Sequence, residues 1–106
     1  QEEEPVALTA RRRGEIVGTA TGTIREHDSY LARLIVPEQE RGAGVGSHLL
    51  AAFEALAVRK GRTRLTLHTL ADGPAREFYE RRGWVAILTM PRWRAGRDFV
   101  QMERVL

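Results

Sequence analysis

The chain has 106 residues, of which 42% are hydrophobic and 29% charged, a composition that excludes disordered and fibrous classes and is typical of a folded globular domain. Its formal net charge is +3 and it has no cysteine, so disulfides, thiolate metal sites and thiol catalysis are excluded. No apolar run approaches the roughly 20 residues of a membrane-spanning helix, and the first residues are acidic, unlike a signal peptide; we therefore expect a single cytoplasmic domain over residues 1–106.

A β-hairpin is predicted at the start of the chain. Apolar and polar residues alternate from Val6 to Arg11, a turn follows at residues 13–15, and residues 16–24 are rich in Val, Thr and Ile. Within the second strand, Gly18 and Gly22 leave one face nearly bare, which indicates close packing against something large.

The rest of the chain alternates strands with helices. Residues 30–36 are mostly apolar and stop at Pro37, which predicts a central strand buried on both faces. Five later elements are predicted: a helix over residues 45–60 ended by Gly61, a strand over 64–70, a helix capped by Asp72 that ends near Arg82, and strands over 84–90 and 98–105. This order predicts an α/β (α+β) fold, a mixed sheet of about six strands with two main helices, whose strands before and after the first helix are parallel.

A glycine-rich loop joins the third strand to the first helix. Glycine lets the backbone approach a ligand closely, and a helix N-terminus offers unpaired amides and the positive end of a dipole, so the loop is suited to phosphate. The Rossmann pattern fails because Ser47 occupies its third glycine position, and the P-loop pattern fails because no lysine follows. A glycine-rich turn that only starts a helix remains the structural alternative. The loop residues are Arg41, Gly42, Ala43, Gly44, Val45, Gly46 and Ser47.

Three motifs taken together resemble the GNAT N-acetyltransferase superfamily. They are Leu34-Ile35-Val36-Pro37, the pattern Arg41-x-x-Gly44-x-Gly46, and Phe78-Tyr79-Glu80-Arg81-Arg82-Gly83-Trp84, with a similar closing strand at residues 100–104. The resemblance covers about residues 6–106. It implies a GNAT-like acyl-CoA N-acyltransferase fold that moves an acetyl group from acetyl-CoA to a primary amine by direct attack, with no acyl-enzyme and no metal.

The resemblance also implies roles for particular residues. The loop amides of residues 41–47 would hold the CoA pyrophosphate, and the backbone of Leu34, Ile35 and Val36 would pair with the pantetheine arm. Phe78 and Tyr79 would line the thioester, with Tyr79 as the general acid that protonates the CoA thiolate. Asp72, where the family commonly has Asn, would lie near the CoA arm.

A general base is not evident from the sequence. Ala32 and Arg33 occupy the region where many family members carry a carboxylate, which leaves His68 as the nearest titratable candidate, because a His with a pKa of about 6.5 can accept a proton from an amine. His27 and His48 have weaker cases, and no residue pair has the spacing of metal ligands.

Several alternatives stay open. The strand and two helices that usually form the amine-binding wall are absent, so a non-catalytic acyl-CoA-binding or regulatory domain is an alternative function. The scattered arginines disfavour nucleic-acid binding, although a basic interaction module at residues 11–13 and 92–97 is a third hypothesis. We expect a small-molecule or peptide amine as acceptor, and a homodimer in which a second subunit covers the sheet beside Gly18 and Gly22.

Overall fold

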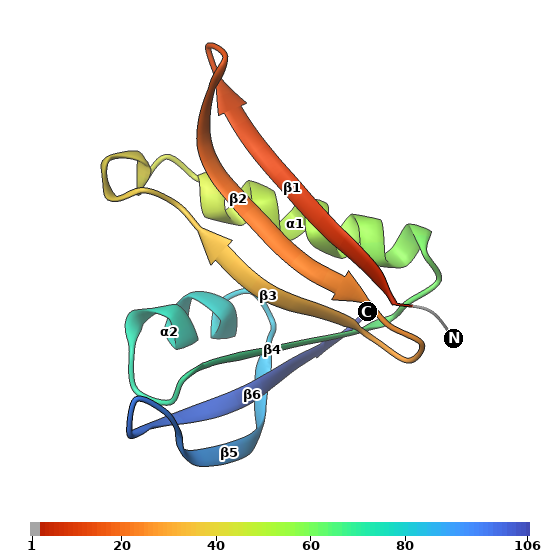
Figure 1. The fold of residues 1–106 in the computed structure, drawn as a ribbon, viewed down its shortest axis with the longest axis vertical. Coiled ribbons are helices and arrows are strands. Elements are labelled where there is room, and N and C mark those ends of the chain that lie inside the picture. The colour runs from red at the N-terminus through yellow and green to blue at the C-terminus, as the bar shows by residue number, and fades with distance from the viewer. Residues whose placement is uncertain (1–2) are drawn as a thin grey trace.

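The computed structural model describes residues 3–106 as a six-stranded sheet with two helices (Figure 1). Both helices are slightly shorter than expected, and the mixed fold is confirmed. The elements are β1 (Glu4–Arg12), β2 (Glu15–Ile24), β3 (Ser29–Ile35), a 3-10 turn (Glu38–Glu40), α1 (Val45–Arg59), β4 (Arg64–Leu70), α2 (Pro74–Glu80), β5 (Val85–Arg94) and β6 (Arg97–Val105).

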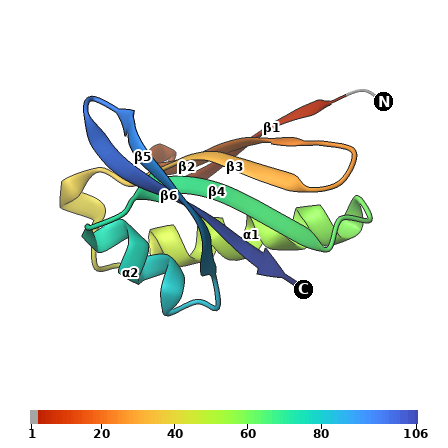
Figure 2. The same cartoon turned by 90° about the horizontal axis from the view of Figure 1, so that it is seen from below.

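The sheet has the strand order β1-β2-β3-β4-β6-β5. Only β3 and β4 pair in parallel, as predicted for two strands joined through a helix, and the other neighbours are antiparallel. Figure 2 shows α1 and α2 on the same side of the sheet. The core therefore lies between the helices and one face, and within residues 3–106 no helix covers the other face.

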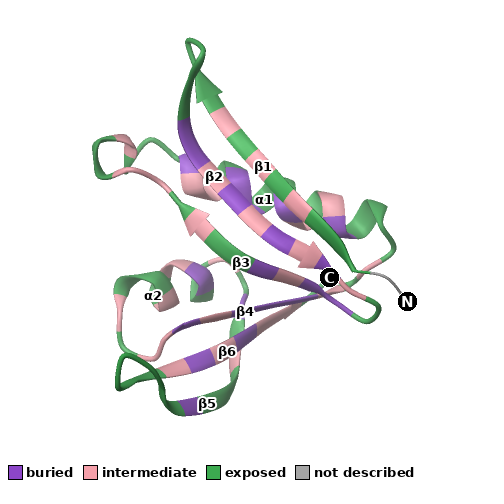
Figure 3. Ribbon diagram, in the orientation of Figure 1, coloured by how far each residue is buried: buried purple, intermediate pink, exposed green. Residues whose placement is uncertain are grey.

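The bare face of β2 accommodates the chain's own helix α1. A Cβ added at Gly18 would come within 2.8 Å of Val45 Cγ1, and one added at Gly22 would come within 3.1 Å of Phe53 Cε1. Phe53 is fully buried there, and buried residues follow β2, β4 and one side of α1 in Figure 3. The prediction of close packing is confirmed, but the idea that these glycines receive a second subunit is wrong.

The prediction that β3 is buried on both faces is also wrong for its second half. Leu31 is buried, whereas Ala32 and Arg33 are exposed and Ile35 is 48% exposed. The cause is the pairing with β4, which comprises only three residue pairs: Ser29 with Leu65, Tyr30 with Thr66, and Leu31 with Leu67. Beyond them the two strands diverge toward their carboxyl ends (Figure 1).

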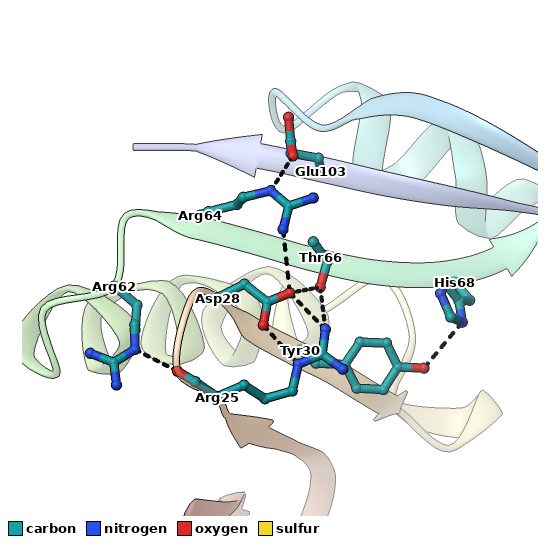
Figure 4. Close-up of polar contacts among 8 residues, drawn as sticks. All are labelled: Arg25, Asp28, Tyr30, Arg62, Arg64, Thr66, His68 and Glu103. Carbon is teal, nitrogen blue, oxygen red and sulfur yellow. Dashed lines mark hydrogen bonds and ion pairs between the residues drawn. The ribbon is translucent and has the colours of Figure 1, made fainter. Parts of the chain in front are cut away.

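A buried carboxylate clamps the paired end of these two strands. Asp28 accepts hydrogen bonds from Arg25 Nε at 2.7 Å and Nη2 at 2.6 Å, and a third from Thr66 Oγ1 of β4 at 2.8 Å (Figure 4). Hydrogen bonding from Arg25 lowers the pKa of Asp28, so the carboxylate stays ionised at neutral pH. One end of the β3–β4 seam is thereby fixed while the other is open.

The close approach of β2 and β3 makes Gly22 a test of this packing. A Cβ at Gly22 would lie 2.1 Å from the carbonyl oxygen of Tyr30, a backbone atom that no rotamer change can move. We expect Gly22→Ala to lower the free energy of unfolding by about 3 kcal/mol, measured by urea denaturation. The matched control is Gly73→Ala, because Gly73 has extended backbone and a Cβ there would make only an ordinary contact of 3.8 Å with Leu70 Cβ, so its substitution should cost about 1 kcal/mol or less. Equal stabilities of the two variants would contradict this packing.

Candidate functional site

The N-terminus of α1 presents free backbone amides. The helix is preceded by Gly44 in the left-handed region (φ 83°), and no side chain caps it. His48 N donates to the carbonyl oxygen of Gly44 at 3.0 Å, and within residues 3–106 the amides of Val45, Gly46 and Ser47 have no acceptor. These amides and the positive end of the helix dipole form a site for an anion.

The amides of Val45 and Gly46 open into a cleft. It has a volume of about 700 Å³ and is bounded on one side by the end of β3 and the glycine-rich loop, and on the other by α2 and the residues that follow it. The first side comprises Leu34, Val36, Glu40, Arg41, Gly42, Gly44, Val45 and Gly46, and the second Pro74, Ala75, Phe78, Tyr79, Arg81 and Arg82.

The structure brings together most, but not all, of the residues expected at the site. Ile35 projects to the opposite face, because its partner on β2 is Thr19 and the neighbouring pair of Leu34 with Ala20 faces α1. Ala43 and Ser47 do not line the cleft, and neither does Asp72. These four predicted residues therefore do not form the walls of the cleft.

The prediction that Asp72 caps the second helix is wrong. The residue before α2 is Gly73, and no side chain makes a capping hydrogen bond. The Asp72 side chain is 89% exposed, and its Oδ1 lies 3.8 Å from Arg97 Nη2. Pro74 stands in the first turn, where its missing N–H needs no partner, so α2 starts without a carboxylate cap.

Sequence reasoning missed Arg82, which joins the two sides of the cleft. Its Nη2 donates to Ser47 Oγ at 2.6 Å and its Nη1 to the carbonyl oxygen of Phe78 at 2.8 Å, while its guanidinium lies 3.8 Å from the centre of the Phe78 ring. Phe78 and Arg82 are four residues apart at the end of α2, a spacing that places side chains on the same side of a helix. That spacing was the available signal. The contact holds a positive charge beside the first turn of α1.

Two charged side chains of the loop are also paired. Arg41 Nε donates to the carbonyl oxygen of Val36 at 3.2 Å, which folds this side chain back over the end of β3. Glu40 would repel a bound anion, but Arg12 at the end of β1 lies 2.6 Å from its carboxylate. Opposite charges at 2.6 Å partly offset the negative potential of Glu40 at the cleft.

Tyr79 lines the cleft together with its neighbour Phe78. It is 8% exposed, and its ring packs at 5.3 Å from Phe78 and 5.7 Å from Trp84, measured between ring centres. Burial raises the pKa of Tyr79 to about 12. The hydroxyl therefore keeps its proton at neutral pH and can act only as a donor of that proton or as a hydrogen-bond acceptor.

The histidines lie outside this cleft. His27 and His48 are exposed, whereas His68 is half-buried on β4, with its Nδ1 3.4 Å from the Tyr30 hydroxyl. Burial lowers the pKa of His68 below its ordinary 6.5, so the ring is neutral at pH 7. Across residues 3–106, no group of three or more His, Asp or Glu side chains is placed to hold a metal ion. In the same residues, no helix is both long and apolar enough to span a bilayer.

Comparison with known proteins places this arrangement among acetyltransferases. A family model described as an acetyltransferase (GNAT) domain matches residues 1–106. An acetyltransferase from Bacillus cereus ATCC 14579 is 30% identical, with a TM-score of 0.87, over 100% of this chain and 76% of that chain. Ard1 from Thermoplasma volcanium is 26% identical, with a TM-score of 0.84, over 89% of this chain and 66% of that chain.

A third solved structure supports the fold alone. The PaiA N-acetyltransferase from Thermoplasma acidophilum, solved in complex with coenzyme A, is 22% identical, with a TM-score of 0.86, over 97% of this chain and 62% of that chain. A comparison with curated protein sequences gives no significant match.

Proposed function

The chain belongs to the GNAT acetyltransferase family, and on that premise we propose that it moves an acetyl group from acetyl-CoA to a primary amine by direct attack. The observation that carries the proposal is the set of free amides at the start of α1, of which Val45 and Gly46 line a cleft that Tyr79 also lines. The cleft combines an anion site with a buried proton donor.

In this proposal the CoA pyrophosphate binds the amides of residues 41–47, beside the positive charges of Arg41 and Arg82. The pantetheine arm lies along the second half of β3, where Leu34, Ile35 and Val36 offer backbone groups that β4 does not use. An arm carrying two amides can bond there like an added strand. A role for Asp72 near the arm remains a prediction, because its exposed side chain is directed to Arg97.

The chemical step needs one bond formed and one broken. The amine nitrogen attacks the thioester carbonyl carbon, the new C–N bond replaces the C–S bond, and the leaving thiolate takes a proton from the Tyr79 hydroxyl. A phenol with a pKa of about 12 donates readily only to a thiolate that is itself poorly solvated. The buried position of Tyr79 provides that environment, since both partners of the transfer would lie away from water.

Three further expectations from the sequence stay predictions. The acceptor is a small-molecule or peptide amine, the protein is cytoplasmic, and a second copy of the chain forms a homodimer, now without support from Gly18 and Gly22. A non-catalytic acyl-CoA-binding or regulatory domain is the alternative function, and the experiments below separate it from the enzyme.

The pyrophosphate site is tested by Gly44→Val. Space around a Cβ at Gly44 is open, so the new side chain would project toward the bound anion rather than into the core. We expect the affinity for acetyl-CoA, measured by isothermal titration calorimetry, to fall at least about tenfold, equivalent to ~1.4 kcal/mol.

The matched control for this variant is Gly61→Val at the other end of α1. Gly61 has a similar left-handed backbone (φ 78°, against 83° for Gly44) and equally open surroundings, so the conformational strain of the two variants is comparable. The control should bind acetyl-CoA like the parent protein. An equal loss of affinity in both variants, or no loss in either, would show that the ligand binds elsewhere.

The proton donor is tested by Tyr79→Phe, which keeps the ring packed against Phe78 and Trp84 but removes the hydroxyl. We expect kcat to fall by about a hundredfold while the calorimetric Kd for acetyl-CoA stays within a few fold. An unchanged kcat would make Tyr79 a packing residue. A parent protein that binds acetyl-CoA yet acetylates no amine in a broad panel would support the non-catalytic alternative.

A further inference from the structure

Three aromatic side chains from three strands meet on the face of the sheet that the helices leave open. They are Tyr30 of β3, His68 of β4 and Trp93 of β5. The centre of the His68 ring lies 5.3 Å from that of Tyr30 and 5.8 Å from that of Trp93, both in edge-on contact. Figure 4 shows Tyr30 and His68 facing each other from neighbouring strands.

The cluster stands where β3 and β4 separate. Leu67 is the last residue of β4 that pairs with β3, so His68 is the first residue beyond the seam. Because the strands separate, the backbone of Leu34 forms no pair with β4, and Leu34 lines the cleft. A group on the open face at His68 is therefore adjacent to the gap in the sheet where the acyl group of the proposed ligand would lie.

A strained bulge holds Trp93 in this cluster. β5 pairs with β6 through Met90 with Phe99 and Arg94 with Arg97, so residues 91–93 oppose Asp98 alone. Arg92 adopts a left-handed backbone (φ 49°), and its N–H donates to Asp98 Oδ1 at 2.9 Å. Bulges of this kind redirect a side chain, and backbone strain in a non-glycine residue is concentrated at functional sites.

Two cations follow residues of the cluster along their strands. Arg33 comes three residues after Tyr30 on β3, and Arg94 directly follows Trp93 on β5. Neither arginine forms an ion pair within residues 3–106, whereas Arg25 is bound by Asp28. Trp93 is 51% exposed, so the cluster is open to a ligand. An unneutralised positive potential beside a neutral imidazole favours a ligand that carries an anionic group.

Besides Trp93, His68 is faced by polar and charged groups from neighbouring elements. They are the Tyr30 hydroxyl from β3, the charges of Arg25 and Arg94, and the Gln101 amide from β6. Burial, followed by the two arginine charges, outweighs the hydrogen bond with Gln101 and keeps the pKa of His68 below its ordinary value. The ring can accept a proton at neutral pH.

We propose that His68, Tyr30 and Trp93 form the acceptor subsite, and that the acceptor is an amine that also carries a carboxylate. The proposal rests on the acetyl transfer inferred above and names its substrate class. Trp93 contacts the acceptor, and Arg94, with Arg33, binds its carboxylate. His68 is the catalytic base and Tyr30 a positioning residue: the tautomer that donates from Nδ1 to the Tyr30 hydroxyl leaves Nε2 to accept a proton.

In the transfer, the proton leaves the attacking nitrogen for His68 as the C–N bond forms. The C–S bond breaks, and the thiolate takes the hydroxyl proton of Tyr79. The products are the N-acetylated acid and CoA, and the two side chains exchange their protons with solvent before the next turnover.

The substrate class is tested with pairs of amines that differ only in charge. Purified protein is given acetyl-CoA with ω-amino acids of increasing length or with the matching ω-amino amides, and CoA release is followed. We expect kcat/KM to be at least about tenfold higher for the acid in the best pair. Arg94→Gln should abolish this preference, whereas Arg59→Gln, an exposed arginine on α1, should keep it. Equal rates for acids and amides at every length would overturn the proposal.

The base is tested by His68→Gln against His27→Gln, an exposed histidine at the β2–β3 turn. We expect kcat of His68→Gln to fall by about a hundredfold. With the same amine used throughout, the amine's ionisation affects both proteins alike, so the ratio of parent to His68→Gln activity should fall on acidification as the imidazole is protonated. The control should keep the rate and the pH profile of the parent protein. An unchanged rate and pH profile in His68→Gln would overturn the role of His68.

Calorimetry on the same samples separates this inference from the proposed function. If the parent protein does not bind acetyl-CoA, the proposed acetyltransferase site itself is contradicted. Binding of acetyl-CoA together with acetylation of uncharged amines only would leave that site intact and contradict the acceptor subsite alone.

Discussion

The incomplete pairing of β3 with β4 is the constraint on which the rest of the structure depends. The two strands share three residue pairs, and the buried carboxylate of Asp28 ties Arg25 and Thr66 together at that end. Because the Asp28 carboxylate is buried, removing its donors would leave its charge uncompensated, so the contact resists separation. The strands can therefore diverge at their other end without the sheet coming apart.

Where β3 and β4 diverge, the cleft lies on the helix side of the sheet and the aromatic cluster on the open side. On the helix side, the end of β3, the first turn of α1 and the residues of α2 enclose a cleft that both the free amides of α1 and Tyr79 line. Arg82 fixes the relative position of the two helices through Ser47. On the open side, the bulge in β5 holds Trp93 against His68 at the same gap. A donor on one face and an acceptor on the other would meet between the strands.

Local patterns in the sequence predicted the elements well, and the failures are all non-local. Alternation and helical spacing predicted the strands and helices, and the apolar run at residues 30–36 predicted β3. Side-chain hydropathy does not show, however, whether a neighbouring strand forms backbone hydrogen bonds along the whole of β3. Gly18 and Gly22 predicted a close contact, but the sequence did not show that the contacting element is α1. The expected cap at Asp72 failed because its side chain lies toward Arg97, a residue of the last hairpin. Arg82 was missed although its spacing of four residues from Phe78 was a usable signal, because its partner Ser47 lies 35 residues away in the sequence.

The most direct test of this account is a crystal structure of the protein with acetyl-CoA. We expect the pyrophosphate oxygens within about 3 Å of the amides of Val45, Gly46 and Ser47, with the pantetheine amides bonded to the backbone of β3 and the thioester between Tyr79 and the gap beside His68. A pyrophosphate bound at the arginines of residues 92–97, or a pantetheine arm that leaves the β3–β4 gap empty, would contradict it.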